Sequence, residues 1–406
     1  MRSAAATPLR LMVITTVPET LAAFFPSQLR SLAQEGFEVH AVSSPGLDLA
    51  EIGKIPGVTV HAIPMERKPH PAHDLVSLFR LFALMRKLRP HIVHAHTPKA
   101  GLLGMAAARA TCVPVRLYTV HGLPLLTRTG KWRKVLEAAE RASAALASRT
   151  YSVSASVREL VVALKLCPAS KIDLLGDGSC AGVNLTRFNP ATLRSSGSAF
   201  REKLGIPSGA LLLSFVGRVA RDKGIEVLAE AWPVIAHQFP NIHLLLAGPL
   251  DHTDPVSESA LTGLRTHARV HMLGAQGLEA TASIYSATDI FVLPTFREGL
   301  SQVALEAGAM GVPIVSCRVS GLDAVQDGVT GLLVPPRDPI SLAQAIAKLA
   351  ANPKFRETVG RAAMSHIQAR YSEQRVNQLW MDEYRKLVKE SLSNVAAMES
   401  RMESHT

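Results

Sequence analysis

The stretch DIFVLPTFREGLSQVALEAGAMGVPI (residues 289–314) decides the fold class of this chain. It begins with a short apolar run that ends at a proline, which is typical of a buried strand in a parallel sheet. A loop with Glu298 and Gly299 follows, and a helix is expected to begin near Ser301. A buried strand that leads through a glycine loop into a helix is the repeating unit of a doubly wound α/β sheet.

The same strand–helix alternation runs through the whole chain in two series, which predicts right-handed crossovers and two parallel sheets. The expected strands of the first series are Arg10–Val17, Glu38–Ser43, Val58–Ile63, His91–His96, Val115–Val120 and Thr150–Val153. Those of the second series are Leu211–Val216, His243–Ala247, Val270–Leu273, Ile290–Leu293, Pro313–Cys317 and Gly331–Val334. Helical patterns separate the strands of the first series, at Phe25–Glu35, Leu75–Leu88, Pro98–Ala110 and Lys131–Ser148.

A length of 406 residues predicts two α/β domains. The boundary is expected near residues 182–200, which contain glycine, proline and the polar run Ser195–Ser198. We therefore predict an N-terminal domain over 1–185 and a C-terminal domain over 186–375. Residues 376–406 are expected to form a helix that packs back on the N-terminal domain, with a polar tail. Open α/β sheets bind ligands beyond the carboxyl ends of their strands, so two domains that face a central cleft suit an enzyme with two substrates.

The chain is basic, with 44 Lys and Arg against 33 Asp and Glu and a net charge of +11. Residues 1–185 carry 22 Lys and Arg against 12 Asp and Glu, or +10, which leaves +1 for the rest. The first domain is therefore expected to meet an acidic partner, for which anionic lipid, a diphosphate-bearing acceptor and nucleic acid are the candidates. Four scattered cysteines indicate a reducing compartment, in which the thiols are expected to be buried and structural. No stretch has the roughly 20 apolar residues that span a bilayer.

The stretch that decides the fold also carries two carboxylates. Glu298 lies on the loop before the expected helix, so its carboxylate and that of Glu306 can converge on one ligand. Gly299 permits a close approach to the backbone. Free N–H groups at the helix start form an anion site, and they belong to Leu300, Ser301 and Gln302. The alternative interpretation is a solvated charge pair beside a helix start.

A second segment, FVGRVARDKG (residues 215–224), leads from a strand into a glycine turn with two cations five positions apart. A departing diphosphate needs several charge-assisted donors where its negative charge grows. Arg218 supplies a rigid fork of donors and Lys223 a mobile point charge. The alternative is a surface turn with two solvated cations.

These two segments resemble the retaining GT-B glycosyltransferases of family 4, and the resemblance is strongest from Phe215 to Pro335. In that family the first Glu of a Glu-x7-Glu motif contacts the donor sugar and the second binds the nucleotide ribose. The resemblance assigns these roles to Glu298 and Glu306, and the family's diphosphate-binding cations to Arg218 and Lys223. The donor site that it implies comprises Gly217, Arg218, Lys223, Glu298, Gly299, Leu300, Ser301 and Glu306.

In the first domain, YTVHGLP (residues 118–124) ends a strand in a glycine turn, which exposes the imidazole of His121 at the carboxyl edge of the sheet. The alternative is a histidine whose hydrogen bonds are satisfied within the turn. The family has a comparable His-Gly pair that faces the donor sugar. The resemblance therefore implies that His121 hydrogen-bonds the donor sugar or stabilises the positive charge that develops on the sugar ring. This makes His121 a catalytic candidate together with Arg218, Lys223 and Glu298.

The segment HAHTPKAG (residues 94–101) places His94 and His96 on one face of a strand, because side chains alternate along it. No third ligand is apparent, so no metal site is predicted. Lys99, in the first turn of a helix, can meet an anionic acceptor, or it can be an ordinary solvated lysine. Family members that build bacterial surface polysaccharides commonly carry a similar stretch, which makes His96 and Lys99 candidate acceptor contacts.

The first strand–helix loop departs from the family pattern. Many members have a Gly-Gly pair there that approaches the donor phosphates, whereas residues 15–20 read TTVPET. A bulky or prolyl backbone cannot copy a glycine-mediated approach. We therefore expect this loop, through Thr16, to face the acceptor instead.

Residues 123–134 mix apolar side chains with Trp132 and four cations, a composition that suits an anionic membrane surface. The alternative is a mobile loop that leads into a helix. Nucleic-acid binding is not supported, because the sequence has neither a matching motif nor an aromatic stacking platform. Localisation in the cytoplasm, peripheral on the inner face of the plasma membrane, is expected.

The resemblance implies a metal-independent hexosyltransferase that needs no cofactor and transfers a sugar with retention from a nucleotide diphosphate, with a UDP-sugar as the expected donor. The expected acceptor is a polyprenyl-diphosphate-linked saccharide in surface polysaccharide, O-antigen or lipopolysaccharide biosynthesis. Two alternatives are an epimerase-like nucleotide-sugar enzyme that transfers nothing and a catalytically silent nucleotide-binding scaffold. Release of nucleoside diphosphate only in the presence of acceptor separates transfer from both.

Overall fold

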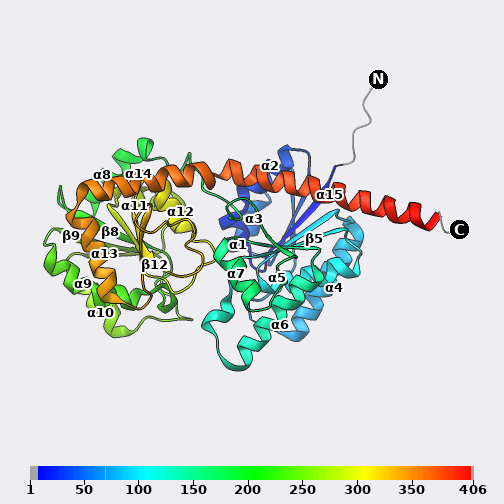
Figure 1. The fold of residues 1–406 in the computed structure, drawn as a ribbon, viewed down its shortest axis with the longest axis horizontal. Helices are drawn as coiled ribbons and strands as arrows, with labels where there is room; N and C mark the ends of the chain where they lie inside the picture. The colour runs from blue at the N-terminus through cyan, green and yellow to red at the C-terminus, as the bar shows by residue number, and fades with distance from the viewer. Residues whose placement is uncertain (1–7, 69, 404–406) are drawn as a thin grey trace, which may run out of the picture. The chain divides into compact units, whose positions relative to one another are not determined.

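The computed structural model describes residues 8–68 and 70–403, and it divides into two compact units. Unit 1 comprises Met1–Ala181 with Gln374–Thr406, and unit 2 comprises Gly182–Glu373. Each unit is built on a parallel β-sheet with helices packed against it (Figure 1). The doubly wound α/β fold class expected from the strand–helix alternation is therefore confirmed for both halves of the chain.

Within the described residues, the sheet of unit 1 has seven parallel strands in the order β3-β2-β1-β4-β5-β6-β7. Their bounds are β1 Arg10–Ile14, β2 Glu38–Ser43, β3 Val58–Ala62, β4 Ile92–His96, β5 Val115–Val120, β6 Arg149–Ser152 and β7 Ile172–Leu174. The order reverses between β1 and β4, which is the switch point where ligands bind in open sheets. The short strand β7 was missed by the sequence analysis, because three residues with a central Asp173 give no recognisable period.

The helices of unit 1 cover this sheet. Their bounds are α1 Pro18–Phe24, α2 Pro26–Gln34, α3 Leu47–Ile52, α4 Pro71–Leu88, α5 Pro98–Ala110, α6 Gly130–Leu146, α7 Ala155–Ala163 and α15 Glu373–Glu403, with a 3-10 turn η1 at Pro124–Thr127. Helix α5 packs against both α4 and α6. Helix α15 runs beside α2 (Figure 1), where Asn377 Nδ2 donates to Ser27 Oγ at 3.0 Å. It continues to Glu403, where a polar tail was expected after Ser393.

Unit 2 repeats the design with a sheet that, in the described residues, has six parallel strands in the order β10-β9-β8-β11-β12-β13. Their bounds are β8 Leu211–Val216, β9 Ile242–Ala247, β10 Val270–Gly274, β11 Ile290–Leu293, β12 Ile314–Cys317 and β13 Gly331–Val334. The switch point lies between β8 and β11. Both segments that carry the predicted donor chemistry follow these two strands, so the fold brings them to one edge of the sheet.

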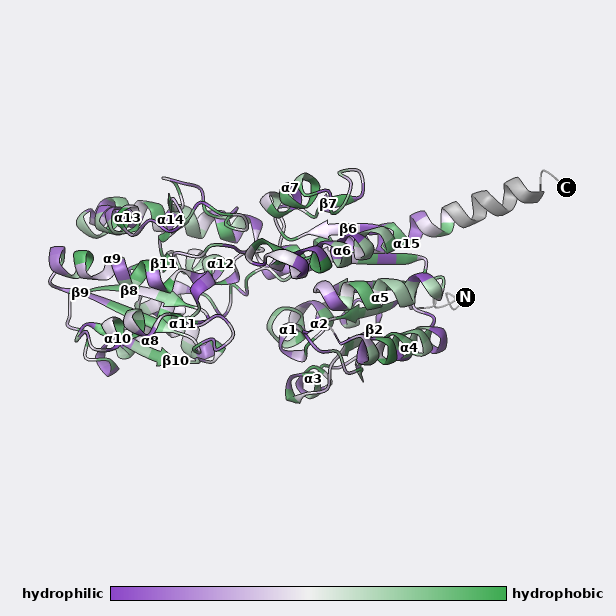
Figure 2. Cartoon of the chain, turned by 90° about the horizontal axis from the view of Figure 1, so that it is seen from below, coloured by the Kyte–Doolittle hydropathy of each residue, from purple (hydrophilic) through white to green (hydrophobic). Residues whose placement is uncertain are grey.

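Two layers of helices enclose this second sheet. Their bounds are α8 Pro190–Lys203, α9 Ile225–Gln238, α10 Glu258–Arg265, α11 Leu278–Ala287, α12 Gln302–Ala309, α13 Pro339–Ala351 and α14 Pro353–Arg370, with a 3-10 turn η2 at Arg221–Lys223. Helix α9 packs on α13 and α8 packs on α11, on opposite sides of the sheet (Figure 2). The strands between them are buried over most of their length, except for the edge strand β10, which is partly exposed.

One expectation about the linker is wrong. The polar run Ser195–Ser198, taken as part of a linker, lies inside helix α8 of unit 2. Asn189 caps this helix by accepting from Ala191 N at 3.0 Å. Gly197 faces α11 so closely that a Cβ would lie 2.6 Å from Ser286 Oγ. A glycine contact between two helices is a tertiary effect, and composition alone reads such a segment as a loop.

The predictions about a membrane-spanning segment and about the cysteines can be compared with the described residues. Among them, no helix combines the length and apolarity needed to cross a membrane. Of the cysteines, which all lie in the described part, Cys167, Cys180 and Cys317 are buried and free, whereas Cys112 is exposed and free. The expectation of buried thiols is therefore wrong for Cys112, which lies just after α5, where the chain turns.

Candidate functional site

The two loops that follow β8 and β11 touch at the switch point of unit 2. Gly224 ends turn η2 with a φ of 71°, and a Cβ there would lie 1.9 Å from the carbonyl oxygen of Pro294. The backbone N–H of Phe296 donates to the carbonyl oxygen of Asp222 at 2.9 Å. Only glycine allows this approach, so the two segments form one surface.

Lys223 and Glu298, which the sequence analysis assigns to different parts of the donor, form an ion pair. Lys223 Nζ lies 2.6 Å from Glu298 Oε1, and the two side chains are 18% and 12% exposed. A cation and a carboxylate with this little exposure neutralise one another until a ligand with its own charge arrives. The fold thus places both predicted residues at one point.

Arg218 lies in the same loop and is held by carboxylates that the sequence analysis did not single out. Its guanidinium contacts Asp251 and lies 3.6 Å from Asp222, and its side chain is 47% exposed. Hydrogen bonds from the backbone and hydroxyl of Thr253, with Arg218 nearby, lower the pKa of Asp251 to about 2. Asp251 is therefore a fixed negative charge that orients the fork of Arg218.

Asp222 also holds a further cation, Arg297, whose Nη2 lies 3.2 Å from Asp222 Oδ2. Asp222 and Arg297 lie inside the quoted motifs, directly before Lys223 and Glu298. The sequence does not reveal their ion pair, because it does not show that the two loops meet. The cluster of cations and carboxylates in the described residues comprises Arg218, Lys223, Arg297, Asp222, Asp251 and Glu298. Its formal charges cancel, so a diphosphate competes with these carboxylates for the cations.

The anion site at the start of α12 differs from expectation. The helix begins at Gln302, close to the predicted start near Ser301, but the N–H of Ser301 is not free. It donates to the carbonyl oxygen of Gly321 at 3.0 Å. Gly321 has a φ of 82°, and a Cβ there would lie 2.5 Å from the carbonyl carbon of Glu298. The loop after β12 therefore closes over this helix start, an approach that the local sequence does not reveal.

Glu306 lies on α12 with 8% exposure and hydrogen bonds to two side chains. Tyr285 Oη donates to its Oε2 at 3.3 Å, and Gln302 Nε2 donates to its Oε1 at 3.4 Å. Burial raises the pKa of Glu306 to about 7, against the smaller lowering effect of these hydrogen bonds. Its charge therefore changes near neutral pH, unlike that of an exposed glutamate.

His121 follows β5 in unit 1, and the expectation that its imidazole is exposed is wrong. The residue is partly buried, and its Nε2 lies 2.8 Å from His96 Nδ1. The rings of Phe24 and Phe25 lie 6.3 and 6.4 Å from its ring. Burial lowers the pKa of His121 to about 4, so its ring is neutral at physiological pH.

His94 and His96 share one face of β4, as strand alternation predicts, with ring centroids 4.0 Å apart. Both are buried, with exposures of 0% and 1%. His94 Nδ1 lies 2.7 Å from Tyr384 Oη of α15, and its Nε2 lies 2.7 Å from Thr119 Oγ1. His96, a predicted acceptor contact, is therefore enclosed by protein.

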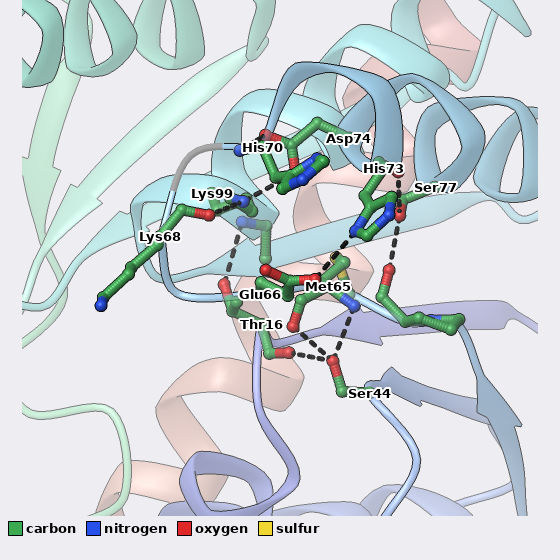
Figure 3. Close-up of polar contacts among 12 residues, drawn as sticks. Thr16, Ser44, Met65, Glu66, Lys68, His70, His73, Asp74, Ser77 and Lys99 are labelled. Atoms are coloured by element: carbon green, nitrogen blue, oxygen red, sulfur yellow. Dashed lines mark hydrogen bonds and ion pairs between the residues drawn. The ribbon is translucent and has the colours of Figure 1, made fainter.

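Thr16, another predicted acceptor contact, ties the β1–α1 loop to the start of α5. Its hydroxyl lies 2.7 Å from Thr97 Oγ1 and accepts from the backbone N–H of Ala100 at 3.2 Å. Its carbonyl oxygen lies 2.8 Å from Ser44 Oγ, whose single O–H is shared with the Met65 carbonyl oxygen at 2.6 Å (Figure 3). A threonine thus satisfies a donor at a helix N-terminus that a glycine in this loop could not.

Lys99 is the third predicted acceptor contact, and it points into the polar cluster in Figure 3. Its Nζ lies 2.6 Å from Asp74 Oδ1 and donates to the carbonyl oxygen of Lys68 at 2.5 Å. The two charged side chains are 11% and 22% exposed. Glu66 and His73 form a second, exposed pair at 2.9 Å beside them. An anionic acceptor would therefore have to compete with Asp74 for Lys99.

The described ranges, 8–68 and 70–403, contain no group of three or more His, Cys, Asp or Glu side chains that could hold a metal ion. His94 contacts a tyrosine hydroxyl, and His96 shares a hydrogen bond with His121, which follows β5.

Comparisons with known proteins agree on one family. The family model described as Glycosyl transferases group 1 matches residues 210–352, and the model described as Glycosyl transferase 4-like domain matches residues 21–178. The capsular polysaccharide biosynthesis glycosyltransferase CapM of Staphylococcus aureus is 32% identical over 366 residues, which cover 90% of this chain and 94% of CapM. This chain is a group 1 glycosyltransferase of family 4.

Two further proteins match most of this glycosyltransferase. A D-inositol 3-phosphate glycosyltransferase of Arthrobacter sp. strain FB24 is 28% identical over 358 residues, which cover 81% of this chain and 80% of that one. The sucrose-phosphate synthase of Thermosynechococcus elongatus superposes with a TM-score of 0.78 at 24% identity, covering 93% of this chain and 99% of its own. The expected GT-B fold is therefore confirmed.

A second solved structure has the same fold. HepE of Anabaena in complex with UDP-glucose superposes with a TM-score of 0.75 at 18% identity, and covers 95% of this glycosyltransferase and all of HepE. At this identity the likeness concerns the fold.

Proposed function

We propose that this glycosyltransferase transfers a sugar, with retention of anomeric configuration, from a UDP-sugar to a polyprenyl-diphosphate-linked saccharide. The product belongs to a surface polysaccharide, for which capsule, O-antigen and lipopolysaccharide are the candidates. One observation carries the proposal: Arg218, Lys223 and Arg297 meet three carboxylates at the carboxyl ends of β8 and β11. The name of CapM and the UDP-glucose bound to HepE support the choice of product and donor.

In the proposed reaction the cations of unit 2 stabilise the leaving diphosphate. Arg218 is oriented by Asp251, and Lys223 is available once Glu298 turns to the sugar hydroxyls. Charge-assisted donors fixed in place before reaction lower the barrier because they need no reorganisation as negative charge grows. The acceptor hydroxyl attacks the anomeric carbon on the face that the diphosphate leaves, and its proton passes to the departing phosphate oxygen.

Each half of the chain has a separate task in this proposal. Unit 2 binds the donor through the cluster, Gly217, the loop Gly299–Ser301 and Glu306, which accepts hydrogen bonds from the ribose. Unit 1 binds the acceptor through Lys99 and the loop at Thr16, and it presents His121 to the donor sugar. These residues act as protein groups alone, without a metal ion or cofactor.

A role for Glu306 on the ribose predicts that donor binding weakens in acid. Ribose hydroxyls bind the carboxylate in preference to the carboxylic acid, and the pKa of Glu306 is raised to about 7. Protonation therefore competes with the ligand below pH 7. The Kd of a UDP-sugar is expected to rise up to about eightfold between pH 7.5 and pH 6. Calorimetry measures this with a UDP-sugar, whose diphosphate does not titrate in this range.

Glu306→Gln is the matched control for this pH series. The amide keeps the shape of the side chain and cannot titrate, so its Kd is expected to be flat over the same range. A wild-type Kd that does not change between pH 7.5 and pH 6 would remove the carboxylate from the ribose site.

We further propose that unit 1 rests on an anionic membrane. In the segment 123–134, Leu123 and Leu125 are buried, whereas Trp132 on α6 is 59% exposed among exposed cations. Phe79 on α4 is 68% exposed, and the sequence analysis did not single it out. Apolar side chains among cations suit a surface of anionic headgroups, with the net charge of +10 over residues 1–185 adding long-range attraction.

Removal of these exposed apolar groups is expected to weaken vesicle binding. Phe79→Ala and Trp132→Ala should each lower the partition coefficient about tenfold, because a buried aromatic side chain contributes roughly 1.5 kcal/mol or more. Flotation with vesicles that contain roughly 30% anionic lipid measures the change. Ile340→Ala, an equally exposed apolar position of unit 2, is the control and should bind like wild type. Equal vesicle binding of all three variants would contradict the proposed membrane contact of Phe79 and Trp132.

The proposed reaction itself is tested with nucleotide sugars and membrane extract from a polysaccharide-producing bacterium. We expect release of UDP that depends on the extract, and labelled sugar in the lipid fraction. Conversion of the nucleotide sugar without extract would favour the epimerase-like alternative. Nucleotide binding in calorimetry with no turnover under any of these conditions would favour a silent scaffold.

A further inference from the structure

The contact between His96 and His121 constrains where each imidazole carries its proton. His96 Nδ1 and His121 Nε2 lie 2.8 Å apart, so one nitrogen donates and the other accepts. His96 is 1% exposed, and its Nε2 is buried with no hydrogen-bond partner in the described part of the chain. The ring centroids of Phe25 and His96 lie 4.5 Å apart. The proton that His96 carries must therefore be on Nδ1 or on a nitrogen that has no acceptor.

The protonation states leave two arrangements. Burial lowers the pKa of His96 well below its usual value and that of His121 to about 4, so each neutral ring has a single N–H. If His121 donated through Nε2, the N–H of His96 would be on its buried Nε2 without an acceptor. A buried N–H without an acceptor is rarer in proteins than an acceptor without a donor. The favoured arrangement has His96 donating from Nδ1 to His121 Nε2.

We propose that His96 is a positioning residue, which holds His121 in the tautomer with its proton on Nδ1. His121 then acts as a neutral hydrogen-bond donor toward the donor sugar. The sequence left open whether His121 hydrogen-bonds the sugar or stabilises the positive charge that develops on the sugar ring. The Nδ1–H tautomer provides the N–H that the first of these roles requires. The inference rests on the proposed function only where it names the sugar as the group that receives the hydrogen bond.

The nearest ring to His96 is engaged elsewhere and does not compete with His121 for its Nδ1. His94 lies against His96 at 4.0 Å, and both nitrogens of His94 are occupied, by Tyr384 Oη and Thr119 Oγ1. Tyr384 is fully buried and belongs to α15, so the C-terminal helix supports this chain of contacts within unit 1. A ring flip of His96 would place its Nδ1 away from His121 and break the bond. The hydrogen bond to His121 therefore favours the observed orientation of the His96 ring.

The tautomer of His121 can be observed directly by NMR with ¹⁵N-labelled histidine in the full chain. Long-range ¹H–¹⁵N spectra distinguish protonated from bare ring nitrogens, and His121→Gln assigns the signal. Free neutral histidine prefers its proton on Nε2, so the reverse form is diagnostic. We expect the Nδ1–H form in wild type at pH 7.5. An Nε2–H form for His121 would overturn the proposal, whatever the enzyme transfers.

Two substitutions of equal polarity then test the role of His96. His96→Asn keeps an amide near the position of Nδ1, whereas His96→Gln moves it toward the position of Nε2. His96→Asn is expected to retain the Nδ1–H form of His121 and to keep kcat within a few-fold of wild type. His96→Gln is expected to lose that form and to lower kcat roughly 10- to 100-fold, the range seen when a histidine loses its orienting partner, with little change in KM for the donor.

The outcomes separate this inference from the proposed function. Thermal melts of both variants show that they are folded, and a merely structural role would affect both variants alike. An unchanged His121 tautomer in His96→Gln would overturn the positioning role. Wild-type protein that transfers no sugar, yet has His121 in the Nδ1–H form that His96→Gln loses, would refute the proposed function and leave the tautomer assignment standing.

Discussion

Arg218→Ala is expected to lower kcat about 10²- to 10³-fold, which corresponds to roughly 3 kcal/mol of barrier. The physical reason is that a rigid guanidinium, oriented by Asp251 and near Asp222, offers donors where the leaving diphosphate gains charge. Folding stability should change little, because Arg218 is 47% exposed and the pKa of Asp251 is held low chiefly by Thr253. Steady-state transfer kinetics with a saturating donor measure the effect.

The adjacent arginine of the same turn provides the control. Arg221 donates to the carbonyl oxygen of Pro255 at 3.3 Å, so it contacts a backbone oxygen where Arg218 contacts carboxylates. Arg221→Ala should therefore keep kcat within a few-fold of wild type, with the same loss of net charge. If both variants lose activity equally, the effect is one of general electrostatics and Arg218 has no specific place at the diphosphate.

The fold could be predicted from the sequence because strands and crossover helices leave strong local patterns. Helix α5 was predicted with its observed bounds, Pro98–Ala110, since a proline begins it and the apolar period is clear. The polar segment of α8 was misread, because its helix is stabilised by contact with α11 rather than by its own composition. The three-residue strand β7 has too few side chains to show a period.

The candidate site could be predicted only where chemistry and local sequence coincide. Glu298 and Lys223 stand in recognisable motifs, but their contact depends on two loops that meet through Gly224. Asp251 follows β9, in a segment without any motif, and nothing in its surroundings predicts that it holds Arg218. The burial of His96 and the pairing of Lys99 with Asp74 likewise follow from packing of distant segments. Sequence identifies the groups, and tertiary structure decides their charge state and partners.

The Lys223–Glu298 pair allows structure and catalysis to be separated by a double-mutant cycle. Each partner is largely buried, so removal of one leaves an uncompensated charge. Lys223→Met and Glu298→Gln are each expected to lower the free energy of unfolding by about 3 kcal/mol, the low end for a buried pair. The double variant removes both charges and should recover most of that loss. Urea unfolding of the four proteins gives the coupling energy.

Transfer kinetics of the same four proteins give the second half of the cycle. If the pair acts on the donor, kcat stays low in the double variant although its stability returns, because neither the diphosphate cation nor the sugar carboxylate is restored. The exposed pair Arg318–Asp327 of unit 2 is the matched control, with side chains 61% and 41% exposed and a separation of 2.7 Å. Its removal should cost less than about 1 kcal/mol and leave kcat unchanged. Activity that recovers together with stability in the Lys223→Met, Glu298→Gln double variant would reduce the pair to a structural contact.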